Sequence, residues 1–374
     1  MRIAFVYDGA YPWIKGGVEK RLHEIGKGLV KRGHEVHWYC VGWWLNENRN
    51  RDIEVDGINY HAVCGPMEMY VNGRRSIRET LYFGIRTLNG LKGEFDIIDC
   101  QEFPYFPCFS ARFYSALKSK PMVITWHEVW DDYWYEYLGW KGVFGKIIER
   151  MTARLSARNI AVSHKTGRDL QRLGVSDPQI IPNGVDFKGV NRVEPSELKS
   201  DVIYAGRLVE HKNVDVLLRA IKILKEDIPD IRCFIIGDGP EKPSLVKMVD
   251  DLGLEDNIQF FDFLDSHDKL ISLMKSSRVF ALPSTREGFG IVVLEANACG
   301  LPVVTVNHPD NAACDLINSG NGSVCNLSEK EIAESISMHL NGGNSLRRSC
   351  IENGRKYDWE RITSMVESFY ISIL

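Results

Sequence analysis

The chain has 374 residues, of which 44% are apolar and 26% charged, enough for two hydrophobic cores in a soluble protein. Its formal net charge of −4 gives no indication of a nucleic-acid partner, and no apolar run approaches the roughly 20 residues that span a bilayer. The first residues lack the basic region and cleavage site of a signal peptide, and nine cysteines are scattered without a CxxC pair. We therefore expect a cytoplasmic protein of two domains with reduced thiols.

The N-terminal residues have the pattern of a β-loop-α-β unit. The apolar run 2–7 predicts a buried parallel strand, residues 18–29 carry apolar side chains at helical spacing, and 34–41 is the second strand. Gly16 and Gly17 lie between the first strand and the helix. There they are at the carboxyl end of a strand, where open α/β sheets bind ligands, and at a helix N-terminus, where a phosphate can approach. Loop geometry alone would also explain two glycines.

Residues 43–60 predict a loop with an edge hairpin, and further strands are expected at 97–100, 122–125 and 159–162. His127 follows the strand at 122–125, so it also lies on the ligand side of the sheet. A histidine in that place has either a structural or a catalytic role.

The turn signal Ile181-Pro-Asn-Gly-Val-Asp186 precedes a polar stretch with few core residues, and it predicts the domain boundary. We expect an N-terminal domain of residues 1–184 and a C-terminal domain of residues 185–357. Residues 358–374 predict an amphipathic helix.

The second domain alternates strands with helices, and it predicts another doubly wound sheet. Five strands are expected, at 202–205, 232–236, 258–261, 279–282 and 302–306.

Arg207 and Lys212 follow the first of these strands, just before a helix. Two cations there can neutralise a diphosphate, and arginine can bind it through two hydrogen bonds. The alternative is a solvated helix start. Phe263 and Leu264 follow the strand at 258–261, where the backbone of their loop can contact a nucleotide base.

Residues 283–304 carry two carboxylates eight positions apart, Glu287 and Glu295. A glycine-rich segment, 288–290, follows the first, and an apolar run, 291–298, then predicts a buried helix ended by Gly300. At about 1.5 Å per residue, the two carboxylates are separated by roughly 8–9 Å along the helix. This separation suits a sugar at one end, a diphosphate over the helix N-terminus and a ribose beside the helix. The alternative is a surface glutamate followed by a helix-capping one.

This pattern resembles the E-x7-E signature of family 4, the retaining glycosyltransferases of group 1. The resemblance implies an α/β chain with the GT-B fold, in which two Rossmann-like, doubly wound domains face each other across a cleft and the C-terminal helix packs back on the first domain. It implies that Glu287 binds the donor hexose, Glu295 the ribose, and Arg207 and Lys212 the pyrophosphate. It also places His127 against the hexose. The implied catalytic residues are Glu287, His127, Arg207 and Lys212, and the implied donor-binding residues are Gly16, Gly17, Arg207, Lys212, Phe263, Leu264, Glu287, Gly288, Phe289, Gly290, Ile291, Val292 and Glu295.

The implied reaction moves a hexose from a uridine or guanosine diphosphate sugar to a glycan or lipid-linked glycan, with retention of configuration. Two cations stand where other transferases use a metal, and no Asp-x-Asp motif accompanies them, so we expect no metal and no cofactor. Neither half carries a GxGxxG motif after its first strand, which weakens a dinucleotide-binding interpretation. Two alternatives stay open, a GT-B enzyme of other chemistry such as a nucleotide-sugar epimerase or a phosphorylase, and a non-catalytic sugar-binding module.

The segment 130–158 is dense in tryptophan and tyrosine and then predicts a helix at 145–157. Aromatic residues suit a boundary between apolar and wet phases, and basic amphipathic helices lie on anionic membranes. The segment therefore indicates a peripheral contact with the inner face of a membrane. The alternative is that the aromatic residues line an acceptor cleft or pack the domain, with the basic residues as a solvated face. The basic residues at four-residue spacing are Lys146, Arg150, Arg154 and Arg158.

Overall fold

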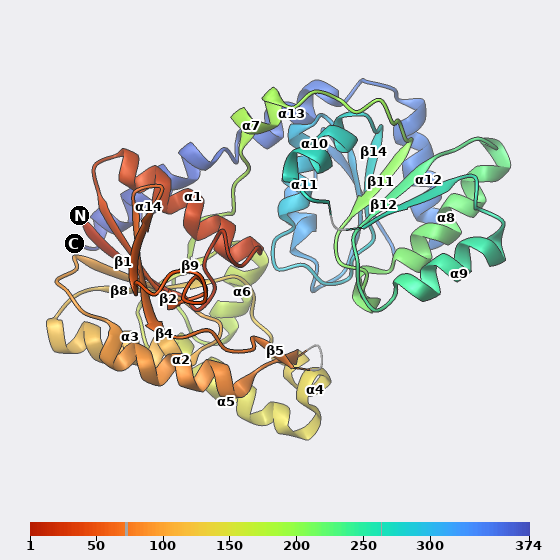
Figure 1. The fold of residues 1–374 in the computed structure, drawn as a ribbon. Coiled ribbons are helices and arrows are strands. Elements are labelled where there is room, and N and C mark those ends of the chain that lie inside the picture. The colour runs from red at the N-terminus through yellow and green to blue at the C-terminus, as the bar shows by residue number, and fades with distance from the viewer. Residues whose placement is uncertain (72–73, 263) are drawn as a thin grey trace. The chain divides into compact units, whose positions relative to one another are not determined.

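The computed structural model describes every residue except 72, 73 and 263. The chain forms two compact units, which are described one at a time (Figure 1). The N-terminal unit contains Met1–Asn183 and Trp359–Leu374, and the C-terminal unit contains Gly184–Asp358.

The N-terminal unit has an eight-stranded sheet in the order β10-β9-β8-β7-β1-β2-β4-β3. All neighbouring strands are parallel except the edge pair β3–β4. This pair is an edge hairpin as predicted, but its second strand continues beyond the predicted end at residue 60, to Cys64. The strands are β1 (Arg2–Val6), β2 (Glu35–Val41), β3 (Asp52–Val55), β4 (Ile58–Cys64), β7 (Ile97–Gln101), β8 (Met122–Trp126), β9 (Arg158–Ala161) and β10 (Gln179–Ile180), and a separate ribbon joins β5 (Tyr70–Val71) to β6 (Arg74–Arg75).

Helices cover both faces of this sheet because its strands are apolar on both sides. One face packs against α1 (Gly17–Lys31) and the C-terminal α14 (Trp359–Ser372). A side chain at Gly28 of α1 would lie 2.5 Å from Thr363 of α14, so the two helices approach closely. The other face carries α2 (Ile77–Gly90), α3 (Phe106–Lys118), α4 (Tyr133–Leu138), α5 (Gly142–Ala153) and α6 (His164–Arg172).

The helix predicted at 145–157 is wrong in its bounds, because α5 begins at Gly142 and ends at Ala153. Arg154 is the residue after its last turn, and Arg158 starts β9. The basic residues therefore do not form one helix face. Part of the preceding aromatic cluster packs the unit, since Trp134 of α4 is buried and a side chain at Gly145 would lie 2.2 Å from it.

The C-terminal unit has a six-stranded sheet, wholly parallel, in the order β13-β12-β11-β14-β15-β16. Its strands are β11 (Val202–Ala205), β12 (Cys233–Ile236), β13 (Ile258–Phe261), β14 (Val279–Leu282), β15 (Val303–Val306) and β16 (Gly322–Cys325), and its helices are α7 (Phe187–Arg192), α8 (Val214–Asp227), α9 (Lys242–Leu252), α10 (His267–Lys275), α11 (Ile291–Ala298), α12 (Glu329–Asn341) and α13 (Arg347–Arg355). The prediction of five strands missed β16, which is short, starts with glycine and is only partly buried.

Within the described residues, no helix combines the length and apolar character needed to cross a membrane. All nine cysteines are free.

Candidate functional site

Each sheet reverses its strand order beside its first strand. In the C-terminal unit β12 lies on one side of β11 and β14 on the other, and in the N-terminal unit β2 and β7 flank β1 in the same way. The loops leaving two such strands diverge to opposite faces of the sheet, which opens a crevice at their carboxyl ends. The candidate site residues gather at these two places, and the two sets are described separately.

Lys212 and Glu287 meet at the carboxyl ends of β11 and β14. Lys212 ends the short 3-10 helix η2 (Glu210–Lys212), and Glu287 lies in the loop before α11. The Lys212 Nζ lies 2.5 Å from the Glu287 Oε1, and both side chains are 13% exposed. The structure thus brings together a cation and a carboxylate that lie 75 positions apart in the sequence.

Asn213 ties these two loops together. It adopts a left-handed conformation, with φ of 50°, which asparagine tolerates better than most residues. Its Nδ2 donates to the Pro283 carbonyl at 3.0 Å, and the backbone N–H of Thr285 donates to the His211 carbonyl at 3.0 Å. The ammonium of Lys212 is therefore held beside the loop that carries Glu287.

The surroundings of His211 show how cationic this place is. Burial lowers its pKa to about 4, and the positive charges of Lys212, Arg286 and Arg207 lower it further. His211 is consequently neutral at pH 7, and the local charge comes from the three cations. Arg207 is exposed and, within the described residues, has no ion-pair partner. Arg286 was not predicted, although it directly precedes Glu287.

The glycine-rich segment 288–290 leads into α11. Gly290 has a positive φ of 90°, and a side chain there would lie 3.0 Å from the Ala313 Cβ, so glycine suits this position on both counts. The backbone N–H of Glu287 donates to the Asp310 carbonyl, which fixes the loop against the segment after β15. Phe289 is buried, Ile291 and Val292 are partly buried, and Gly288 is partly exposed. This leaves the first-turn N–H groups of an eight-residue helix beside the Lys212–Glu287 pair.

Glu295 lies one to two turns along α11 and is only 5% exposed. Its Oε1 lies 3.2 Å from the Nε2 of His267, the first residue of α10. His267 was missed, although it follows β13 at the carboxyl end of the sheet, where Leu264 also lies. Phe263, the other residue predicted in that loop, lies outside the described residues.

In the N-terminal unit, His127 ends a chain of buried polar side chains. The Asp99 carboxylate accepts from Gln101 Nε2 at 3.0 Å, which turns the Gln101 Oε1 towards His127 Nε2 at 2.9 Å. Because that oxygen can only accept, His127 carries its proton on Nε2 and leaves Nδ1 as an acceptor. Asp99 also accepts from Thr125 Oγ1 at 2.8 Å and from the hydroxyl of Tyr370 in α14.

Charge and burial keep His127 neutral. Burial lowers its pKa to about 3, and the positive charge of Arg21 adds to the effect. Beside it, the Glu102 Oε1 accepts from the His127 backbone N–H at 3.1 Å, and burial raises the pKa of Glu102 to about 8. Glu102 was missed, although it directly follows β7. Its position at a strand end is the same signal that identified His127.

Gly16 and Gly17 lie exposed at the start of α1. The buried carboxylate of Glu19 folds over this loop, because a side chain at Gly16 or at Gly9 would lie 2.3 Å from one of its oxygens. Burial raises the pKa of Glu19 to about 7, although its own backbone N–H and the Tyr7 side chain oppose the rise. The two glycines therefore belong to a tightly packed loop whose outer side is open.

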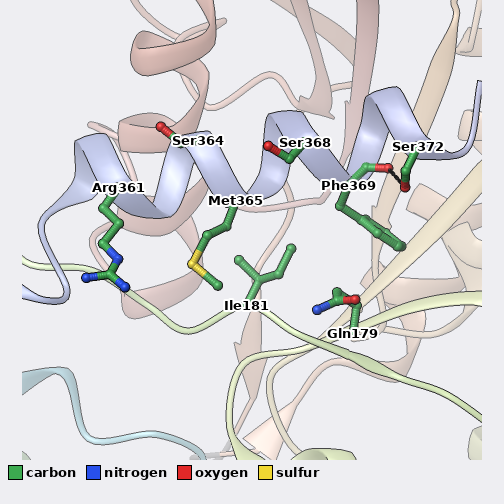
Figure 2. Close-up of a pocket in the computed structure, with 8 residues that line it drawn as sticks. All are labelled: Gln179, Ile181, Arg361, Ser364, Met365, Ser368, Phe369 and Ser372. Atoms are coloured by element: carbon green, nitrogen blue, oxygen red, sulfur yellow. Dashed lines mark hydrogen bonds between the residues drawn. The ribbon is translucent and has the colours of Figure 1, made fainter.

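The site is marked neither by a metal cluster within the described residues nor by the surface hollow beside α14. Among the described residues, no three His, Cys, Asp or Glu side chains are placed to hold a metal ion. The hollow in Figure 2 lies between the β10 segment and α14, where the side chains of Met365 and Phe369 point towards Ile181. None of the predicted site residues lines it.

Two family models match the chain, and together they cover most of it. The model described as Glycosyltransferase Family 4 matches residues 15–188, and the model described as Glycosyl transferases group 1 matches residues 191–357. A phosphatidyl-myo-inositol mannosyltransferase of Propionibacterium freudenreichii is 26% identical over 99% of this chain and 94% of that protein. A component of the human phosphatidylinositol N-acetylglucosaminyltransferase is 23% identical over 98% of this chain and 75% of its own length.

Solved structures resemble the whole chain. Sucrose-phosphate synthase from Thermosynechococcus elongatus superposes with a TM-score of 0.81 at 18% identity, covering 100% of this chain and 98% of that one. Anabaena HepE, in a complex with UDP and glucose, superposes with a TM-score of 0.76 at 19% identity, covering 100% of both chains. These likenesses agree with the fold that the sequence predicted.

Proposed function

The chain belongs to glycosyltransferase family 4 and has the GT-B fold, and we propose that it moves a hexose from a nucleotide-diphosphate sugar to a hydroxyl group of a glycan or lipid-linked glycan, with retention of configuration. The observation that carries this proposal is the Lys212–Glu287 pair, which lies where the strand order of the C-terminal sheet reverses. An ammonium and a carboxylate at one helix N-terminus offer a partner for phosphate and an acceptor for sugar hydroxyls.

The donor diphosphate has three sources of positive charge in the C-terminal unit. Arg207 is exposed and open to a bidentate contact, Lys212 can exchange Glu287 for a phosphate oxygen, and the N-terminus of α11 contributes its unpaired N–H groups. The exchange frees the Glu287 carboxylate to accept hydrogen bonds from the hexose. Glu295, further along α11, accepts from the ribose, and His267 beside it orients that carboxylate.

We favour a transfer on one face of the sugar over a double displacement. A retaining glycosidase uses two carboxyl groups about 5 Å apart around one bond. Here Glu287 pairs with Lys212 and Glu295 pairs with His267, so the two serve different parts of the donor. The bond from the anomeric carbon to the phosphate oxygen breaks, the acceptor oxygen bonds to the same face of that carbon, and the departing diphosphate takes the acceptor proton. Lys212 and Arg207 stabilise its growing charge without a metal.

The N-terminal unit supplies the remaining contacts in this proposal. We propose that the backbone of the Gly16–Gly17 loop contacts the donor phosphates and that His127, which is neutral, contacts the hexose, as the family resemblance implies. The acceptor is a glycan or a lipid-linked glycan of polysaccharide or glycolipid biosynthesis. The names of two relatives specify a phosphatidylinositol-type acceptor, which supports the lipid-linked class. We place the enzyme in the cytoplasm, at the inner face of a membrane, with 130–158 in contact with it.

A ligand screen followed by product analysis tests the function. A thermal-shift screen of uridine and guanosine diphosphates and their sugars identifies the donor, since a ligand at 100 times its dissociation constant stabilises the fold by about 2.7 kcal/mol. NMR of the donor with and without acceptor then separates the alternatives. Transfer yields a new glycosidic bond, an epimerase changes the donor sugar without an acceptor, and a binding module leaves the donor unchanged. Either of the last two outcomes contradicts the proposal.

A further inference from the structure

The helix α2 turns apolar side chains towards water, whereas its buried side carries Glu79, Thr80 and Thr87 beside Phe83. Its exposed residues Ile77, Leu81, Ile85 and Leu88 are 60%, 39%, 63% and 44% exposed, while Phe83 is fully buried. The four exposed residues are spaced by four, four and three positions, so they form one stripe along the helix. A surface helix of a soluble domain normally turns a mainly polar side outward, whereas the outward side of α2 combines this apolar stripe with Arg78 and Arg86.

Two other helices on the same face of the sheet repeat this feature. In α3, Phe113 and Leu117 are 58% and 68% exposed, and in α5, Phe144 and Ile147 are 58% and 49% exposed. Trp140, directly before α5, is 74% exposed. Contiguous exposed apolar side chains of this size mark interaction sites more often than free surface.

The three helices present these residues on one side of the N-terminal unit. Phe83 of α2, Ala111 of α3 and Ala153 of α5 pack into one core cluster on the same face of the sheet. Ser110 of α3 donates to the Gly84 carbonyl of α2 at 2.7 Å, which joins the first two helices directly. Figure 1 shows α2, α3 and α5 along the lower side of this unit. We call their outward side the α2–α3–α5 face.

Within the described residues, the exposed charged side chains of this face that lack an ion-pair partner are all positive. The only acidic residues of the three helices, Glu79 and Glu149, are 1% and 0% exposed. Lys118 and Lys146 are paired with acidic side chains outside the helices. The exposed arginines form no ion pair within the described residues, and they are Arg78, Arg86, Arg112 and Arg150.

We infer that the α2–α3–α5 face docks on a bilayer that contains anionic phospholipids. Apolar side chains enter the interface while arginines bind phosphate groups, and the chain's net charge of −4 makes this cationic face a local exception. A second copy fits less well, because a two-fold contact would bring the arginines of one face against those of the other. The inference rests on the proposed lipid-linked acceptor for its purpose, and it extends the predicted contact at 130–158 to α2 and α3.

Vesicle co-sedimentation of the full chain tests the inference. We expect the wild type to sediment with phosphatidylcholine vesicles that contain phosphatidylglycerol, and to do so less at high salt or without the anionic lipid. The double variant Arg78→Glu/Arg86→Glu should partition at least about 25-fold more weakly, since each of the two arginines near an anionic surface contributes roughly a fivefold factor. Leu81→Glu/Ile85→Glu should lose binding at all salt concentrations.

Matched controls carry the same changes on the C-terminal unit. Lys330→Glu/Arg348→Glu reverses two exposed charges, and Met338→Glu places a charge at an apolar position that is 55% exposed. These variants should bind as the wild type does, and unchanged circular dichroism should show that all variants are folded. The inference is overturned if the wild type stays in the supernatant at low salt, or if the controls lose as much vesicle binding as the α2 variants. It is also overturned if only changes in α5 weaken vesicle binding. A dimer seen by light scattering that the α2 changes dissociate would contradict it as well. Transfer to a soluble acceptor, measured on the same variants, separates its failure from failure of the proposed function.

Discussion

The hydroxyl of Tyr370 links the C-terminal helix α14 to the polar chain that ends at His127, and Tyr370→Phe removes this link alone. The hydroxyl donates to the Asp99 carboxylate, and both residues are buried, at 0% and 4% exposure. A hydrogen bond to a charged group contributes about 1.5–3 kcal/mol, and one between neutral groups about 0.5–1.5 kcal/mol. The loss should therefore depend on whether Asp99 is ionised.

The pKa of Asp99 gives the sign of this dependence. Burial raises it from 3.8 to about 6, and Tyr370 is the first of several groups that oppose the rise. Without the hydroxyl, the pKa of folded Asp99 should rise further, by about one unit per 1.4 kcal/mol of lost stabilisation of the carboxylate. At a pH between the two pKa values, Asp99 is still protonated in the folded variant but is already ionised in the folded wild type. The deficit in the free energy of unfolding should therefore grow as the pH rises from about 5 to about 8.

Urea unfolding followed by tryptophan fluorescence measures this deficit. All nine tryptophans lie in the N-terminal unit, so the signal reports the unit that contains Asp99. Tyr39→Phe is the matched control, since its buried hydroxyl donates to the neutral Lys92 carbonyl. We expect a deficit near 1 kcal/mol at pH 5 and about 2–3 kcal/mol at pH 8 for Tyr370→Phe, against a constant deficit for the control. Equal, pH-independent deficits in both variants would refute the reasoning.

Three further predictions concern the donor. Lys212→Ala should slow transfer about 10- to 150-fold, because it removes a charge-assisted contact of about 1.5–3 kcal/mol. Lys222→Ala, on the exposed side of α8, serves as the control. Steady-state kinetics that give an unchanged kcat/KM for Lys212→Ala would remove Lys212 from the site. Glu287→Ala should impair sugar transfer more than binding of the free nucleotide diphosphate, and Glu295→Ala should weaken the free nucleotide itself; calorimetry that finds equal losses would contradict this division. Activity should survive EDTA, and its loss with recovery on adding a divalent ion would disprove the metal-free mechanism.

Regular elements were predictable because their signals are local. The buried runs at 202–205 and 279–282 and the helix at 291–298 have the predicted bounds, since a parallel strand is apolar throughout and Gly300 ends the helix. The prediction missed β16 because Gly322–Cys325 contains no apolar run and only its first residue is buried. The predicted bounds of the helix at 145–157 were wrong because the four-residue spacing of basic residues continues past Ala153, where the chain already turns towards β9.

Partnerships across the fold were not predictable from one sequence. Position at a strand end identified Lys212 and His127, and the spacing of two carboxylates identified Glu287, but the partners of all three depend on which strands become neighbours. The Glu287 contact lies 75 positions from Lys212, and Tyr370 reaches Asp99 across 271 positions. No periodicity in the sequence encodes such pairs. His267 and Glu102 would have been found by applying the strand-end argument to every strand.

The anomeric configuration of the product tests the central claim most directly. Once the screen has identified an α-linked nucleotide-sugar donor, proton NMR of the first product gives the configuration from the coupling of its anomeric proton. We predict an α-linked product from the wild type, because one-face transfer assisted by Lys212 and Arg207 preserves the configuration. A β-linked product would mean attack from the opposite face and would contradict the account.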